Sequence, residues 1–144
     1  MKNIISSIVA LGATLALLSL GTSAHAQNTV SGSITQQTFT FYPQQGATPS
    51  LLDVKVPCTI TNSSFTQDAP VNLHNTISWG GVYGPSPSLD DSFTVTRNST
   101  LVNTTTFELA GWSPNTTYTS TSTLTANNYP SSSTLSTRKD SATS

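Results

Sequence analysis

A regular alternation of threonine in the stretch 109–126 constrains the fold more than any other feature of the chain. The threonines recur at every second position: Thr119, Thr121, Thr123 and Thr125. Tyr118 and Leu124 lie among the residues between them. Successive side chains of a β-strand point to opposite faces of a sheet, so this period of two with β-branched residues predicts a strand. Pro114 and Asn115, just before it, predict a turn.

The same alternation recurs along the rest of the chain. The segments that carry it, the first of which is one strand or a pair, span residues 30–42, 53–61, 71–79, 92–96, 105–109, 118–126 and 132–136. Residues typical of turns separate these segments, and no helical period of useful length follows the N-terminal segment. About seven short strands of this kind predict an all-β fold, an antiparallel β-sandwich, with a small closed barrel as the alternative.

The segment 53–61 has the clearest pattern. Its apolar face is expected to carry Val54, Val56, Cys58 and Ile60. Cys58 is the only cysteine, so the chain forms no internal disulfide, and its apolar neighbours indicate a buried, unreactive thiol. Pro57 cannot donate a hydrogen bond to a neighbouring strand, which indicates an edge strand or a bulge at this position.

Residues 1–26 have the features of a secretory signal peptide. Lys2 is followed by an apolar run, and Ala24 and Ala26 form a small-x-small cleavage signal before Gln27. The apolar run is shorter than the roughly 20 residues that a membrane-spanning helix needs. We therefore expect a secreted or cell-surface protein, with the periplasm as a further location, without a membrane span.

Hydroxyl side chains outnumber charged ones in this chain. It contains 26 Thr and 23 Ser but only five Lys and Arg and six Asp and Glu, a formal net charge of −1. Few cations are present to neutralise phosphates, which argues against a nucleic-acid partner. The periodic apolar residues argue against disorder.

A short motif around the predicted turn resembles a known family. Trp112, Pro114, Asn115, Thr116 and Tyr118 resemble the fibronectin type III pattern of an apolar residue, Pro, Gly or Asn, Thr and Tyr. The resemblance covers residues 70–138. It implies a β-sandwich with a corner tyrosine, and it leaves residues 27–69 as an N-terminal extension.

A second alignment resembles the immunoglobulin family. Cys58 on one strand, Trp79 on the next and Tyr118-x-Ser120 on a later strand are similar to the immunoglobulin Cys, Trp and Tyr-x-Cys arrangement. Ser120 stands where the second cysteine would be. This alignment implies that residues 27–144 form one sandwich, with residues 139–144 as a flexible tail.

Candidate catalytic residues are few. His74 is the only histidine after the signal peptide, and its parity places it opposite Leu73 and Ile77, which predicts a solvent-facing position. Asp90 and Asp91 are two adjacent carboxylates, and a solvated turn explains them better than a Ca²⁺ site. We therefore expect no enzyme activity, no metal and no cofactor.

Exposed aromatic side chains could bind sugars. Tyr83 and Trp112 lie in Gly- and Pro-rich surroundings and are the candidates for such a ligand platform, whereas Trp79 is better explained as part of the core. The sequence therefore predicts a non-enzymatic adhesion, fibre or structural component of the cell surface. A carbohydrate-binding module is the alternative. The expected partners are a protein, a surface polysaccharide, or a second copy bound through strand edges.

Overall fold

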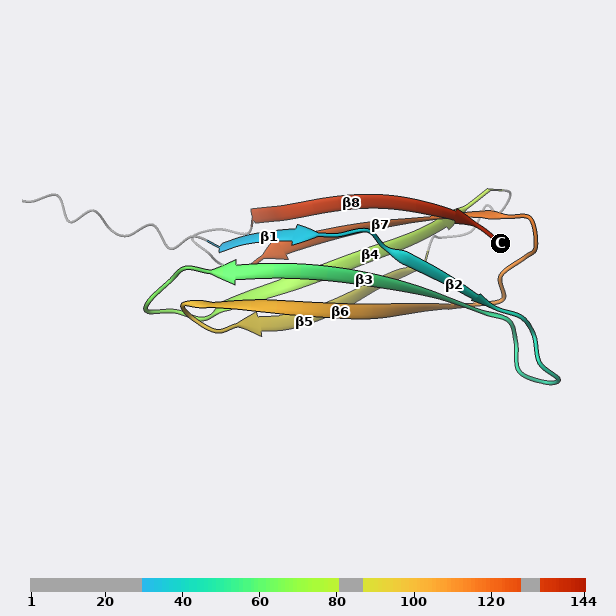
Figure 1. Cartoon of the computed structure of the whole chain (residues 1–144), viewed down its shortest axis with the longest axis horizontal. Helices are drawn as coiled ribbons and strands as arrows, with labels where there is room; N and C mark the ends of the chain where they lie inside the picture. Colours follow the sequence, from blue (N-terminus) through green and yellow to red (C-terminus); the bar gives the residue numbers. More distant parts are fainter. Residues whose placement is uncertain (1–29, 81–86, 128–132) are drawn as a thin grey trace, which may run out of the picture.

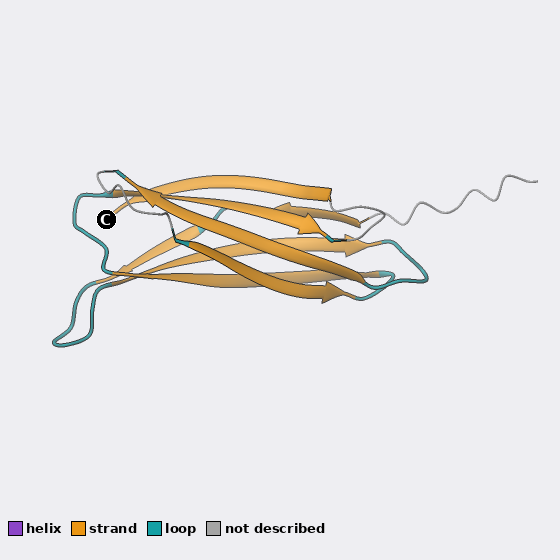
Figure 2. Cartoon of the chain, turned by 180° about the vertical axis from the view of Figure 1, so that it is seen from behind, coloured by secondary structure: helices purple, strands orange, loops and turns teal. Residues whose placement is uncertain are grey.

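The protein is seen in a computed structural model that describes residues 30–80, 87–127 and 133–144. These residues form eight β-strands and, within the described ranges, no helix (Figure 2). The strands are β1 (Val30–Ile34), β2 (Thr38–Tyr42), β3 (Leu51–Asn62), β4 (Ala69–Trp79), β5 (Ser88–Val95), β6 (Ser99–Ala110), β7 (Thr117–Ala126) and β8 (Ser133–Thr143). The all-β fold is confirmed, and the eighth strand arises because residues 30–42 form a pair.

Two antiparallel sheets pack face to face as a sandwich (Figure 1). In one sheet, β3 pairs with β6 on one side and with β1 and β2, end to end, on the other. The other sheet has the order β5-β4-β7-β8. No described helix is long and apolar enough to cross a membrane.

A β-bulge separates β1 from β2. Residues 35–37 lie opposite only residues 56 and 57 of β3, and the backbone amide of Thr35 donates to the Pro57 carbonyl at 3.0 Å. In an antiparallel strand, the backbone N–H and C=O of one residue face the same neighbouring strand. Proline has no backbone N–H, and an N–H at position 57 would point at the bulge, where regular pairing is interrupted. The predicted bulge is confirmed, but β3 is a central strand, so the edge-strand interpretation is wrong.

The core lies between the two sheets and draws on both. The buried apolar residues are Ile34, Leu52, Val54, Val56, Cys58, Ile60, Ala69, Val71, Leu73, Ile77, Val95, Phe107, Tyr118, Leu124 and Ala126. The predicted apolar face of β3 is confirmed. Trp79 is partly buried and packs against this core, as expected.

The segment before β4 is part of the sandwich over its described residues. β1, β2 and β3 form most of one sheet, and the inner face of β3 packs in the same core as β4 and β7. Residues 30–69 are therefore not an N-terminal extension. The fibronectin type III resemblance did not include these residues because its motif lies entirely after residue 70.

The C-terminal residues also belong to a sheet. β8 continues to Thr143 and pairs with β7 along its length, so the flexible tail expected for residues 139–144 is wrong. The hydroxyls of Thr117 and Thr143 are 2.8 Å apart, as are those of Thr119 and Ser141. Backbone pairing and hydroxyl contacts hold this strand, and neither produces the apolar alternation that sequence reasoning detects.

Tyr118 forms the predicted corner. Its side chain is 1% exposed, and its hydroxyl oxygen accepts a hydrogen bond of 2.7 Å from the backbone amide of Ser113. The Tyr118 ring lies 5.7 Å from that of Trp79 and 5.8 Å from that of Phe41. Asn115 takes a φ of 54° in the turn between the two hydrogen-bonded residues, a conformation that Asn tolerates.

The thiol of Cys58 is expected to react slowly in the folded protein. It is buried, and burial followed by the nearby Asp91 carboxylate raises its pKa, so little thiolate forms at neutral pH. Labelling with a maleimide should be slow without denaturant. A Val102→Cys variant, whose new thiol would lie on an exposed strand position, is the rapidly labelled control. Equal labelling rates for the two thiols would contradict the face assignment of β3.

Candidate functional site

A hydrogen-bonded cluster on the outer face of β4 and β5 surrounds His74. His74 Nδ1 lies 2.9 Å from Asp90 Oδ1, and Asn72 Nδ2 donates to the same oxygen at 3.2 Å. These bonds, the one from His74 first, lower the pKa of Asp90. The ionised carboxylate can only accept a hydrogen bond, so this contact requires a proton on His74 Nδ1.

The other ring nitrogen, His74 Nε2, faces two hydroxyl groups. The hydroxyls of Ser88 and Thr76 each lie 3.3 Å from it. A serine, a histidine and an aspartate are in contact here, in the order found in hydrolytic triads. However, the side chains of His74 and Asp90 are 44% and 58% exposed on an open sheet face, and two hydroxyls share Nε2. The predicted outer-face position of His74 is confirmed, whereas its contact with Ser88 depends on strand register that the sequence does not specify.

The two adjacent carboxylates of β5 point to opposite faces of the sheet. Asp90 lies beside His74 on the outer face, whereas Asp91 accepts a 2.6 Å hydrogen bond from the Thr105 hydroxyl of β6. A cation could not be held by both carboxylates at once. Among the described residues, no group of three or more His, Cys, Asp or Glu side chains is placed to bind a metal ion.

Of the two aromatic candidates for a ligand platform, only Trp112 lies within the described residues. Tyr83 lies outside the described residues. Trp112 is partly buried rather than exposed: its ring meets Phe41 edge-on at 5.5 Å, and its Nε1 donates to the Tyr42 carbonyl at 2.8 Å. Trp112 packs in this way because the turn before Tyr118 folds it over β2. The more exposed ring here is that of Tyr42, at 45%, which sequence reasoning did not select.

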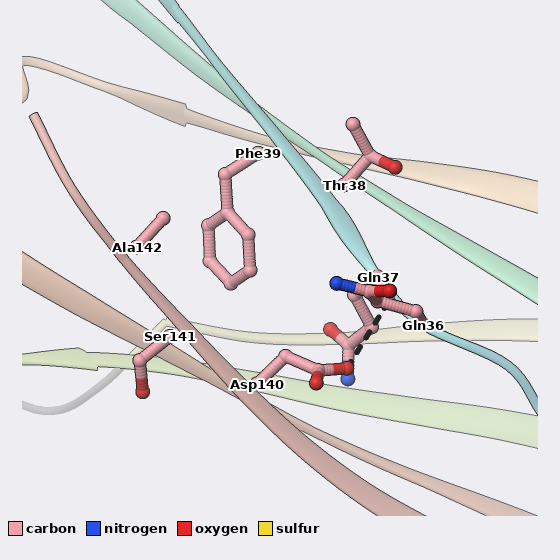
Figure 3. A pocket seen from close by; sticks show the side chains of 7 residues that line it. All are labelled: Gln36, Gln37, Thr38, Phe39, Asp140, Ser141 and Ala142. Carbon is pink, nitrogen blue, oxygen red and sulfur yellow. Dashed lines mark hydrogen bonds between the residues drawn. The ribbon is translucent and has the colours of Figure 1, made fainter.

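A groove of about 490 Å³ lies between β2 and β8, where the edges of the two sheets approach each other (Figure 3). At one end, the Gln37 amide donates to Asp140 Oδ2 at 3.1 Å, and Gln37 Nε2 donates to the Arg138 carbonyl at 3.3 Å. Nearby, the Ser136 hydroxyl accepts from the Ile34 amide at 3.3 Å. Side chains of β8 thus satisfy outward-facing backbone groups at the bulge of the facing sheet.

Acid is expected to destabilise the protein through Asp140. Arg138 Nε donates to Asp140 Oδ2 at 2.6 Å, and this bond is the main cause that lowers the pKa of Asp140. A carboxyl with a lowered pKa contributes stability above its unfolded pKa of about 4, and loses that contribution as the pH falls through the folded pKa. Denaturant melts from pH 7 to pH 2 should show a shallower acid dependence in Asp140→Asn than in the wild type. An identical dependence would contradict this role.

The edge of β6 is the longest open edge in the described structure. β6 pairs with β3 over Ser99–Ala110 without a break in register, and no described strand pairs with its other side. Backbone N–H and C=O groups of successive residues in a strand point alternately to one side and the other. The Gly111 amide donates to the Ser50 carbonyl, so the backbone groups of the odd-numbered residues of β6 face β3. The backbone groups that face the open side belong to Thr100, Val102, Thr104, Thr106 and Glu108.

The other sheet edges carry features that discourage pairing with another chain. β1 and β2 are interrupted by the bulge and bonded to β8 side chains. β5 is shorter and carries the adjacent Asp90 and Asp91, whereas β8 carries Arg138, Lys139 and Asp140 as well as a register shift. By contrast, β6 contains no Lys, Arg, Pro or Gly, and its only charge is Glu108.

A second groove follows the open side of β6. It measures about 460 Å³ and is lined by β5 and β6 residues, including Leu89, Asp91, Thr105 and Phe107. Val102, on the outer face of the same strand, is 75% exposed. An unprotected strand, a groove beside it and an exposed apolar residue therefore coincide at this edge.

Comparison with known proteins gives structural likeness only. No protein-family model and no curated protein matches the chain. A β-glucuronidase from glycoside hydrolase family 2 matches with a TM-score of 0.51 and 12% identity, over 78% of this chain and 12% of that one. The β-glucuronidase 2 of Bacteroides uniformis matches with a TM-score of 0.51 and 13% identity, over 78% and 14%.

A chain of Bacteroides fragilis assigned as a β-galactosidase gives a TM-score of 0.53 and 18% identity, over 78% of this chain and 17% of that one. The likeness is one of fold. This chain therefore resembles a β-sandwich portion of these glycosidases and spans less than a fifth of their length.

Proposed function

We propose that this protein is an exported, non-enzymatic β-sandwich that serves as a structural component of the cell surface, and that it works by pairing its open strand edge with a partner protein. The observation that carries the proposal is the contrast between β6 and the other edges. Three edges carry adjacent charges, a bulge or backbone amides bonded to side chains of the facing sheet, whereas the open-facing backbone groups of β6 make no such bond within the described residues. Backbone hydrogen bonds at such an edge provide affinity for an added strand.

Proline at an open-facing position tests this role. The Thr104 amide points away from β3, so Thr104→Pro removes a donor to a partner without removing a bond within the sheet. The matched control is Ser141→Pro on β8, whose amide points away from β7 by the same alternation. Exported protein should elute in an assembly by size exclusion in the wild type and the control, and as a monomer in Thr104→Pro. Unchanged elution of Thr104→Pro would refute the proposal.

Carbohydrate binding is the second candidate function. Tyr42 is exposed, and with Pro43, Gln45 and Thr48 it lines a hollow of about 210 Å³; aromatic faces beside amides and hydroxyls suit sugar rings. The structural neighbours are glycosidases, although their likeness supports only the fold. Tyr42→Ala should reduce retention on a polysaccharide column, whereas Val102→Ala on β6 should not. Retention unchanged in Tyr42→Ala would remove this candidate.

We infer that the sandwich follows the immunoglobulin-like alignment. Cys58 lies on β3, whereas Trp79 and Ser120 lie on the neighbouring strands β4 and β7 of the facing sheet. Cys58 and Ser120 are both buried between the sheets. The immunoglobulin-like alignment predicts that a Ser120→Cys variant forms a disulfide with Cys58 under oxidising conditions. Two thiols that remain free by thiol titration would contradict the alignment.

A further inference from the structure

We propose that the partner at the open edge is a second copy of this chain, bound through an antiparallel β6–β6 pairing centred on Thr104. This inference rests on the proposed function, because it names the occupant of the same edge. A strand that pairs with its own copy in antiparallel fashion does so about a two-fold axis. The β6-containing sheet of one copy would then join the same sheet of the second copy, so that one continuous sheet crosses the interface.

The backbone limits the possible registers of such a pairing. Open-facing groups alternate along β6, so an open-facing residue must lie opposite an open-facing residue of the second copy. The two longest overlaps that satisfy this rule are centred on Thr104 and on Thr105. With Thr104 at the centre, Thr104 forms a hydrogen-bonded pair with its own copy.

The side chains distinguish these two registers. Centring on Thr104 places Leu101 opposite Phe107, and both pack toward the core. The same register places Asn103 opposite Thr105, so two polar side chains face each other across the interface. Centring on Thr105 would pair Leu101 with Leu109 but place the polar Asn103 opposite the buried Phe107, near the middle of the strand. The mismatch of the register centred on Thr104, Ser99 opposite Leu109, lies at the end of the strand. Matched cross-strand pairs stabilise a sheet, so the register centred on Thr104 is favoured.

Charge is also compatible with the register centred on Thr104. Glu108, the only charged residue of β6, would lie opposite Thr100 of the second copy, and the two Glu108 side chains would sit near opposite ends of the interface. Centring on Thr105 would place Glu108 opposite Val102. Because the other edges formed by described strands are protected, pairing through β6 leaves no open edge among these strands. The expected assembly is a closed dimer rather than a fibre.

Sedimentation of the purified protein tests the partner. The wild type and Ser141→Pro should sediment as dimers at micromolar concentration. Thr104→Pro removes the central bonds of both copies, and should raise the dimer dissociation constant by at least about tenfold. Thr104→Lys places two like charges side by side at the axis and should have the same effect. Melting temperatures of the separated monomers check that both variants remain folded.

Cysteine crosslinking tests the register in a Cys58→Ala background. A hydrogen-bonded antiparallel pair has Cα atoms about 5.5 Å apart, which a disulfide can span. Thr104→Cys should therefore crosslink with itself on oxidation. Thr106→Cys should not crosslink alone, but a mixture of Thr106→Cys and Val102→Cys should give a heterodimer. Efficient self-crosslinking of Thr106→Cys without that of Thr104→Cys would overturn the register.

The outcomes separate this inference from the function on which it rests. A purified wild-type chain that remains monomeric would overturn the inference that the partner is a second copy. If exported protein nevertheless elutes in an assembly that Thr104→Pro disrupts, then β6 binds a different protein and the proposed function stands. If Thr104→Pro affects neither sample, both are refuted.

Discussion

Replacing Tyr118 by alanine is expected to lower the free energy of unfolding by about 3–5 kcal/mol, as truncation of buried aromatic residues does. The ring is almost fully buried and packs against Trp79 and Phe41, so its loss opens a cavity where the two sheets meet. It also leaves the Ser113 amide without the hydroxyl that accepts its hydrogen bond. Chemical denaturation followed by fluorescence measures the change.

Two further variants separate packing from hydrogen bonding at this corner. Tyr118→Phe keeps the ring and removes one acceptor, so it should cost roughly 1–3 kcal/mol. Thr119→Ala, on the opposite face, should cost well under half as much as Tyr118→Ala, because it removes only a hydroxyl contact with Ser141 and a strand preference. A Thr119→Ala variant as damaging as Tyr118→Ala would show that β7 is not one-sided.

Replacing Asn75 by alanine is expected to cost about 2–4 kcal/mol. Two buried serine hydroxyls would lose a partner, at roughly 1–3 kcal/mol for each unsatisfied group, and removal of the buried Asn75 Oδ1, which has no hydrogen-bond partner among the described residues, offsets part of this loss. Asn75 Nδ2 donates to Ser120 Oγ at 2.6 Å and to Ser122 Oγ at 2.7 Å, and all three residues are buried. The control His74→Ala changes the neighbouring outer-face position and should have a much smaller effect.

Removing the whole polar cluster tests the same explanation. The triple variant Asn75→Leu, Ser120→Ala and Ser122→Ala replaces every partner with apolar groups. It should recover most of the stability that Asn75→Ala loses, since a buried polar network with all its members removed leaves no unsatisfied group. Additive losses across the single and triple variants, measured in denaturant melts, would show that these residues do not act as one network.

The corner at Tyr118 could be predicted in detail because its signals are local. The turn at Pro114 and Asn115, the tyrosine three residues later and the alternation that follows all lie within one short segment. The acceptor relation between Tyr118 and the Ser113 amide spans only five residues. In such a segment, backbone preferences and side-chain period determine the geometry before distant strands take part.

Candidate sites were harder to predict because each depends on register between distant strands. Asn75, Ser120 and Ser122 appeared in the sequence only as polar interruptions of apolar faces, and the pairing of β4 with β7 brings them into contact. Likewise, Ser88 and Asp90 meet His74 because β4 pairs with β5. A shift of one residue in either pairing would move every side chain to the other face.

The sequence by itself therefore determined the strands with apolar alternation, the buried face of β3 and the corner at Tyr118, since each follows from a period of two or a local turn. The tertiary structure alone decided that β8 extends to Thr143, that Trp112 folds over β2, and that β6 is left open while the other edges are protected. Strand order and register are set by contacts between segments far apart in the chain, and no local period encodes them.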